Sequence, residues 1–135
     1  MTYAGDAGVD VVNMSFFTDP WLFNCTANPA DSPAEQSEQR VIRQATQRAV
    51  TYAVTHGVLP VAAEGNEATN HPTDNSTSPD YPPDAAKTRT IDNSCITVPT
   101  ETNGVLAVSS TGPSTRKAYY SNYQCRVVKS VAAVR

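Results

Sequence analysis

The chain has 135 residues, of which 39% are hydrophobic and ten are proline, and its ten basic and thirteen acidic residues give a net charge of −3 at pH 7. This length allows one domain with one core, because a chain of about 150 residues buries roughly 70% of its unfolded surface. The sequence shows no Lys/Arg stripe suited to nucleic acid, no run near the ~20 apolar residues that cross a membrane, and no signal peptide, so neither nucleic acid nor a membrane is expected as a partner.

The first expected strand spans residues 9–16. Its side chains are β-branched and apolar on both alternating faces, which is typical of a parallel strand covered on both sides. Residues 1–8 end in Ala-Gly and are expected to form the last turn of a helix that begins outside the chain.

A long helix is predicted next, because residues 32–35 read Ser-Pro-Ala-Glu, a capping box with proline at the first helical position. Gly57 follows His56 as a suitable residue just beyond the helix end. Apolar residues then recur at three- and four-residue intervals and predict the buried face: Val41, Ile42, Ala45, Ala49, Tyr52 and Ala53.

Two further strands are predicted, over residues 58–63 and 105–109, and residues 118–123 are expected to be extended. Strand, helix and strand in this order form a βαβ unit, so the expected fold class is α/β with a parallel sheet. Pro60 conflicts with a central strand position, because proline donates no backbone hydrogen bond.

Residues 66–102 are rich in Asn, Asp, Ser, Thr and Pro without periodicity, and are expected to form a long surface loop. A structural calcium ion is conceivable there, since Asp74, Asp80 and Asp84 supply hard oxygen atoms. Their spacing is not that of an EF-hand, and solvated loop acids are the alternative. No other cofactor is indicated.

The three cysteines, Cys25, Cys95 and Cys125, do not show the spacing of a zinc site. Cys25 and Cys95 each follow an ordered segment within a polar loop, which favours a disulfide between them. Three free thiols are the alternative at this stage.

Chemistry is expected where parallel strands end, because ligands of open α/β sheets bind beyond the carboxyl ends of the strands. Ser15-Phe16-Phe17 follows the first strand and Glu64-Gly65-Asn66-Glu67 follows the second. Gly65 permits a sharp turn, after which the Asn66 carboxamide offers a short N–H donor suited to an oxyanion. An ordinary Gly-Asn turn is the alternative.

Four segments follow one another in the sequence: AGVDVVNMSF (residues 7–16), GVLPVAAEGNE (57–67), GVLAVSS (104–110) and YSNY (120–123). Together they resemble the central part of the catalytic domain of the subtilisin-like serine peptidases, the subtilases of peptidase family S8. The resemblance implies a partial doubly wound parallel sheet in a three-layer α/β/α fold, truncated at both ends. Residues 1–123 would form the partial catalytic domain, and residues 124–135 a basic tail that departs from the pattern.

The resemblance also implies a role for each residue at the two strand ends. Ser15 and Phe16 would pair with the substrate backbone and shape the S1 pocket, while Ala63, Glu64 and Gly65 would form its other wall and Asn66 would be the oxyanion-hole donor. Phe17 stands where many members have glycine and Glu64 where many have a small residue. These two differences predict a bulkier groove entrance and a preference for basic or polar side chains before the scissile bond.

The catalytic triad of this family is absent from the chain, which contains no D-[ST]-G, H-G-T-H or G-T-S-M-A-x-P motif. His56 ends a helix, His71 lies in the polar loop, and Ser114 lacks the nucleophile's helix-opening context. The expected function is therefore a fragment of a secreted, extracellular serine endopeptidase that acts on polypeptides and is inactive alone. The alternative is a non-catalytic α/β module that binds peptides or a partner.

Overall fold

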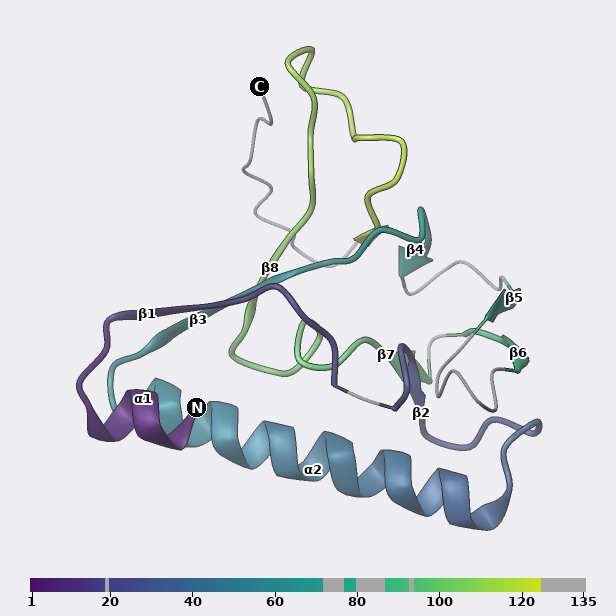
Figure 1. Ribbon diagram of the computed structural model, residues 1–135, viewed down its shortest axis with the longest axis horizontal. Helices are drawn as coiled ribbons and strands as arrows, with labels where there is room; N and C mark the ends of the chain where they lie inside the picture. Colours follow the sequence, from purple (N-terminus) through teal and green to yellow (C-terminus); the bar gives the residue numbers. More distant parts are fainter. Residues whose placement is uncertain (19, 72–76, 80–86, 93, 125–135) are drawn as a thin grey trace.

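The computed structural model describes residues 1–18, 20–71, 77–79, 87–92 and 94–124 and confirms a mixed α/β fold (Figure 1). Two helices, α1 (Thr2–Asp6) and α2 (Pro33–Thr55), accompany the main strands. The strands are β1 (Val11–Met14), β2 (Asn24–Cys25), β3 (Leu59–Ala63), β4 (Asn70–His71), β5 (Thr77–Pro79), β6 (Thr88–Thr90), β7 (Cys95–Ile96), β8 (Leu106–Val108) and β9 (Tyr123–Gln124).

The central sheet is parallel, with strand order β1-β3-β8. Met14 pairs with Ala62 at the end of β1, and Ala63 pairs with Val108 at the end of β3. Helix α2 connects β1 to β3 and runs along one side of the sheet (Figure 1). The predicted βαβ unit is therefore confirmed, and it brings the carboxyl ends of its two strands to the same edge.

Pro60 lies in the central strand, and the alternation of a parallel ladder explains why it is accommodated. The Leu59 N–H donates to the carbonyl of Asp10 on the β1 side, whereas the Glu64 N–H donates to the carbonyl of Val108 on the β8 side. The backbone N–H and C=O groups of the even-numbered residues in β3 therefore point toward β8. Because pairing with β8 begins only at Val61, the nitrogen of Pro60 faces β8 before the ladder starts.

The capping box at the start of α2 is confirmed. The Ser32 Oγ accepts a hydrogen bond from the Glu35 N–H (3.3 Å), and the Ser32 N–H donates to the Glu35 carboxylate (2.7 Å). The predicted buried stripe is wrong at Val41, which is 62% exposed, and at Ala45, which is also exposed, whereas Gln39 in the first half of the helix is fully buried. This half packs against a polar cluster around β2, so an amide is buried there rather than an aliphatic side chain.

The prediction that β1 is covered on both faces is wrong within the described residues. Val11 and Leu59 are about half exposed, at 54% and 48%. Helices α1 and α2 both pack on the opposite face, where Val12 contacts a cluster that includes Ala53 and Val58. A continuous apolar run does not reveal which face finds a partner.

The predicted long loop contains more structure than its composition indicated. β2 pairs with β7, β5 with β6, and β4 with β9. Two of these three pairs join strands about 50 to 70 residues apart, so no local pattern announces them. Asp74, Asp80 and Asp84, the predicted calcium ligands, and Cys125 lie outside the described residues, as does the tail beyond Gln124. Among the residues described, neither helix has the length and apolarity needed to cross a bilayer.

Candidate substrate groove

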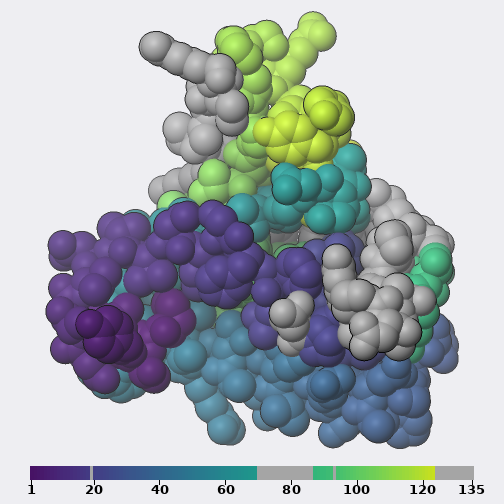
Figure 2. All heavy atoms as spheres, in the orientation of Figure 1, coloured from purple at the N-terminus to yellow at the C-terminus, as the bar shows by residue number. Residues whose placement is uncertain are grey.

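A cavity of about 500 Å³ lies at the carboxyl ends of β1 and β3. In Figure 2, the purple segment that contains β1 and the teal segment that contains β3 and its following loop lie above the blue helix α2. The lining combines the two strand ends with side chains from more distant segments: Ser15, Phe16, Phe17, Leu22, Ala63, Gly65, Asn66, Glu67 and Thr97.

Six of the seven residues predicted for this site line the cavity, because the parallel pairing of β1 and β3 delivers both chain segments to one edge. Phe16 is 60% exposed at the tip of β1, and Phe17 is half-buried. An aromatic side chain at position 17 therefore contributes directly to the cavity wall.

Glu64 is the exception, since it is almost completely buried and does not line the cavity. Residues 60, 62 and 64 are all buried, so Glu64 continues the inward-facing alternation of β3. Glu67 lines the cavity instead and places a carboxylate there. Because residues 58–63 form a continuous apolar run, no signal in the sequence distinguished the inward face of this strand from the outward face.

The turn after β3 places Asn66 at the cavity. Gly65 has φ +100°, a conformation that glycine adopts easily and other residues rarely do. The Asn66 N–H donates to Glu67 Oε2 (2.9 Å), whereas the Asn66 side chain is exposed and has no hydrogen-bond partner among the described residues. Its carboxamide is therefore available to a ligand in the cavity.

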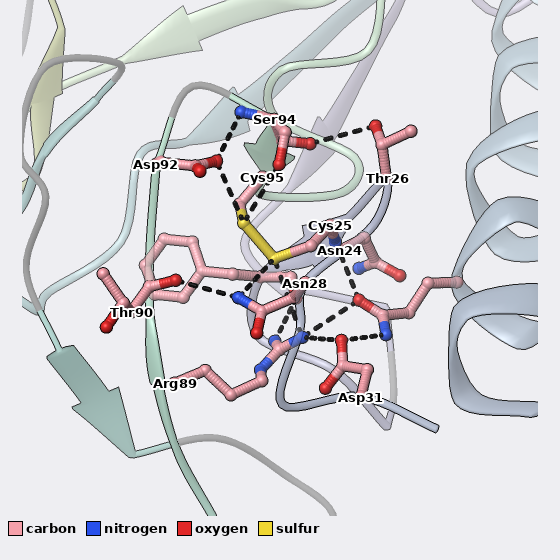
Figure 3. Close-up of a disulfide and its surroundings, with 12 residues drawn as sticks. Asn24, Cys25, Thr26, Asn28, Asp31, Arg89, Thr90, Asp92, Ser94 and Cys95 are labelled. Carbon is pink, nitrogen blue, oxygen red and sulfur yellow. Dashed lines mark hydrogen bonds and ion pairs between the residues drawn. A yellow bond between two sulfur atoms is a disulfide. The ribbon is translucent and has the colours of Figure 1, made fainter. Parts of the chain in front are cut away.

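Leu22 and Thr97 line the cavity but were not predicted. Leu22 precedes β2, Thr97 follows β7, and these two strands pair antiparallel. A disulfide joins Cys25 to Cys95, the pair that the sequence favoured (Figure 3). The same covalent link therefore anchors both additional wall segments. Leu22 and Thr97 therefore reach the cavity through a pairing between segments that are 70 residues apart in the sequence, which a local sequence pattern does not reveal.

A buried polar cluster surrounds this disulfide (Figure 3). The Arg89 guanidinium donates to Asp31 Oδ2 (2.7 Å), to Gln39 Oε1 (3.1 Å) and to the carbonyl of Phe23. Gln39 in turn accepts a hydrogen bond from the Cys25 N–H (2.7 Å). The cluster therefore ties the β2 segment to both α2 and β6.

Two carboxyl groups of this region have lowered pKa values. Burial alone would raise the pKa of Asp31, but hydrogen bonds from Gln39 and Lys87 and the charge of Arg89 outweigh it and lower the pKa. Hydrogen bonds from the Ser32 backbone and from Lys87 lower the pKa of Glu35 to about 2. Both groups are thus ionised at neutral pH and complete the cluster as anions.

The described residues show no metal site, and His56, the histidine whose side chain is described, lies away from the cavity. No group of three His, Cys, Asp or Glu side chains is gathered there in a way that could hold a metal ion. His56 stacks on Tyr52 at the end of α2, with ring centroids 4.0 Å apart, and does not line the cavity.

The fold and the site together define an α/β protein with a parallel sheet, a cavity of about 500 Å³ at its strand ends, and an Asn66 carboxamide at the cavity wall that has no hydrogen-bond partner among the described residues. The sequence profile of the subtilase family (Peptidase_S8) matches residues 1–133. The chain belongs to the subtilase family, as its motifs predicted. A search of curated proteins gives no match.

Solved structures of proteases share this fold. A lanthipeptide protease superposes with a TM-score of 0.61 at 24% identity, covering 92% of this chain and 29% of that protein. The nisin leader peptidase NisP from Lactococcus lactis gives a TM-score of 0.63 at 20% identity, covering 90% of this chain and 32% of the peptidase. The epidermin leader peptide processing serine protease EpiP from Staphylococcus aureus gives 0.53 at 17% identity, covering 90% and 26%. The chain thus spans about a third or less of each.

Proposed function

We propose that this chain forms the substrate-binding part of a secreted serine endopeptidase active site and that it cleaves no peptide alone. The observation that carries the proposal is the cavity that gathers Phe16, Gly65 and Asn66 at the ends of two parallel strands. The Asn66 carboxamide would donate to the oxyanion that forms when a peptide carbonyl is attacked. None of the three triad motifs of the family occurs in the 135 residues, so the nucleophile, its base and the orienting acid would come from elsewhere in a complete enzyme.

The substrate would be an extended polypeptide. Residues 15–17 continue an exposed strand end, where a peptide can pair by strand addition. Phe17 and Leu22 supply apolar wall and Glu67 supplies the carboxylate. A basic or polar side chain that is long enough to cross the apolar surface fits this combination. Glu67, rather than the buried Glu64, would select it.

An extracellular location follows from the same proposal. Disulfides persist in oxidising compartments and are rare in the cytosol. The Cys25–Cys95 bond anchors two segments of the cavity wall, so the groove would depend on it. Secretion would therefore preserve the substrate site itself.

The groove is tested by titrating the chain with a fluorescent octapeptide that carries Arg in a central position. Phe16→Ala is expected to weaken binding about tenfold, since a well-placed interface aromatic contributes more than 1 kcal/mol. Tyr3→Ala is the matched control, because Tyr3 is also a highly exposed aromatic residue but does not line the cavity. Equal peptide affinities of the two variants would refute peptide binding in this cavity.

The catalytic half of the proposal is tested separately. A fluorophosphonate probe, which phosphonylates activated serines, is expected to leave the chain unlabelled, and labelling would contradict the proposal. In the gene, in-frame D-[ST]-G and H-G-T-H motifs before this sequence and a G-T-S-M-A-x-P motif after it would support a divided active site. Saturable peptide binding without those motifs would instead favour the non-catalytic binding module.

A further inference from the structure

Asn122 lies directly beneath the turn that carries Asn66, and it is completely buried. Its side-chain oxygen accepts hydrogen bonds from the Glu67 N–H (3.0 Å) and the Thr69 N–H (2.9 Å). Its side-chain nitrogen donates to the Glu64 carbonyl (2.8 Å) and to Glu67 Oε2 (2.6 Å). A carboxamide has two donor hydrogens and two acceptor lone pairs, so all four are used on the segment 64–69.

Two further contacts hold Gly65, in the turn after β3, against Asn122. The Asn122 N–H donates to the Gly65 carbonyl (3.1 Å). A Cβ atom built on Gly65 would lie 2.7 Å from Asn122 Nδ2 and 2.6 Å from Glu67 Oε2, which no real Cβ tolerates. Gly65 is therefore required by its close approach to the Asn122 amide as well as by its positive φ.

The Glu67 carboxylate connects the Asn122 side chain to the backbone of Asn66. One oxygen, Oε2, accepts hydrogen bonds both from Asn122 Nδ2 and from the Asn66 N–H (2.9 Å). The backbone of Asn66 is thus held through a single carboxylate oxygen that is itself held by Asn122. Displacing the Asn122 amide would release Glu67, and with it the residue that presents the cavity donor.

We infer that Asn122 is a positioning residue for Asn66: it fixes the 64–69 turn so that the Asn66 carboxamide meets the reacting carbonyl oxygen. This role rests on the proposed function. A carboxylate at position 122 keeps the two acceptor bonds but has no hydrogen for Glu64 or Glu67, and it places a second negative charge beside Glu67. An aliphatic side chain loses all four side-chain bonds.

The test uses the ¹⁵N-labelled chain and the variant Asn122→Asp. Amide hydrogen exchange is expected to accelerate at least tenfold at Asn66, whose N–H loses the Glu67 carboxylate, relative to amides of β1 and β3 in the same sample. Exchange at Glu67 and Thr69 is expected to stay unchanged, because the aspartate still accepts both of their N–H groups, whereas a loss of general stability would accelerate all three amides.

Asn24→Asp is the matched control, because Asn24 is also fully buried but bonds the carbonyl of Trp21 away from this turn. It is expected to leave the relative exchange of the Asn66 amide unchanged. If Asn122→Asp does not fold, Glu67→Ala replaces it, since position 67 is exposed and the change removes the carboxylate that joins Asn122 Nδ2 to the Asn66 N–H. That variant is expected to raise the backbone mobility of Asn66 in ¹⁵N relaxation while Thr69 stays protected. Unchanged exchange of the Asn66 amide in Asn122→Asp, or an unchanged Asn66 in Glu67→Ala, would overturn the inference.

An activity measurement separates this inference from the proposed function. In an active peptidase that contains this chain, Asn122→Asp is expected to lower kcat about 10²-fold with KM unchanged, the scale of a misplaced catalytic group. A raised KM with unchanged kcat would refute positioning. If the unmodified peptidase shows no activity, the proposed function fails while the exchange data still decide whether Asn122 holds the turn.

Discussion

The buried ion pair between Arg89 and Asp31 gives a quantitative prediction for the variant Arg89→Met. Both side chains are fully buried, and their nitrogen and oxygen atoms are 2.7 Å apart. Removing one partner of a buried pair costs about 3–5 kcal/mol, because the other charge remains in a low-dielectric surrounding. Lys87, whose Nζ lies 3.0 Å from Asp31 Oδ1, still compensates part of that charge, so we expect about 3 kcal/mol.

The predicted loss is large compared with the total stability of a domain of this size, which is about 5–15 kcal/mol. For roughly 135 residues it corresponds to a Tm lower by about 10 °C. The assay is thermal and urea unfolding followed by circular dichroism at pH 7, with the disulfide intact. Methionine retains most of the unbranched stem volume, so the loss reports on the guanidinium rather than on a cavity.

The control for this experiment is Arg48→Met, an exposed position on α2. Surface changes of this kind alter stability by no more than about 0.5 kcal/mol. If Arg89→Met proved as stable as Arg48→Met, the cluster would not hold the β2 segment as argued. The carbonyl of Phe23, which Arg89 bonds, adjoins Leu22 in the cavity wall, so a destabilised Arg89→Met is also expected to bind groove peptides more weakly.

Two further predictions concern the same region. Replacing Cys25 and Cys95 with alanine is expected to lower stability by about 4 kcal/mol, the chain-entropy value for a loop of some 70 residues, and urea unfolding with and without reductant measures it; an unchanged midpoint would contradict a structural role. Asp31 and Glu35 have pKa values below their ordinary range, so their stabilisation is present above about pH 4.5 and is lost as the pH falls toward 2. Urea midpoints between pH 7 and 2 should therefore fall in that window, and Glu35→Gln should fall less steeply; parallel curves for the two proteins would refute the assignment.

The sequence predicted those parts of the fold that depend on interactions between residues close together in the chain. The capping box around Ser32 and Glu35 is set by residues three apart, and the structure reproduces it. The end of β3 and its Gly-Asn turn are marked by the change from an apolar run to Gly65 and Asn66. The rule that ligands meet the carboxyl ends of parallel strands then placed both strand ends at one cavity without reference to contacts.

The remaining parts could not be predicted because they depend on distant partners. Gln39 is buried and Val41 exposed, since a guanidinium from β6 and the loop at Asp31 meet this side of α2. Leu22 reaches the cavity only because β2 pairs with β7. A polar amide inside a helix and a leucine before a two-residue strand carry no periodic signal, so the sequence did not indicate that either side chain faces inward.

The three walls of the groove are held by different kinds of interaction, and the difference follows from what each wall has to do. The wall at Leu22 supplies apolar surface, for which burial is non-directional and a tolerance of an ångström is acceptable. The wall at Phe16 and Phe17 supplies extended backbone, which the pairing of β1 with β3 already orients. In the proposed function, the wall at Asn66 would place one N–H within hydrogen-bond range of an atom that is charged only during reaction, which requires a positional tolerance of about 0.5 Å. Directional bonds from a rigid amide achieve that tolerance where packing does not, and this is the wall beneath which Asn122 is buried.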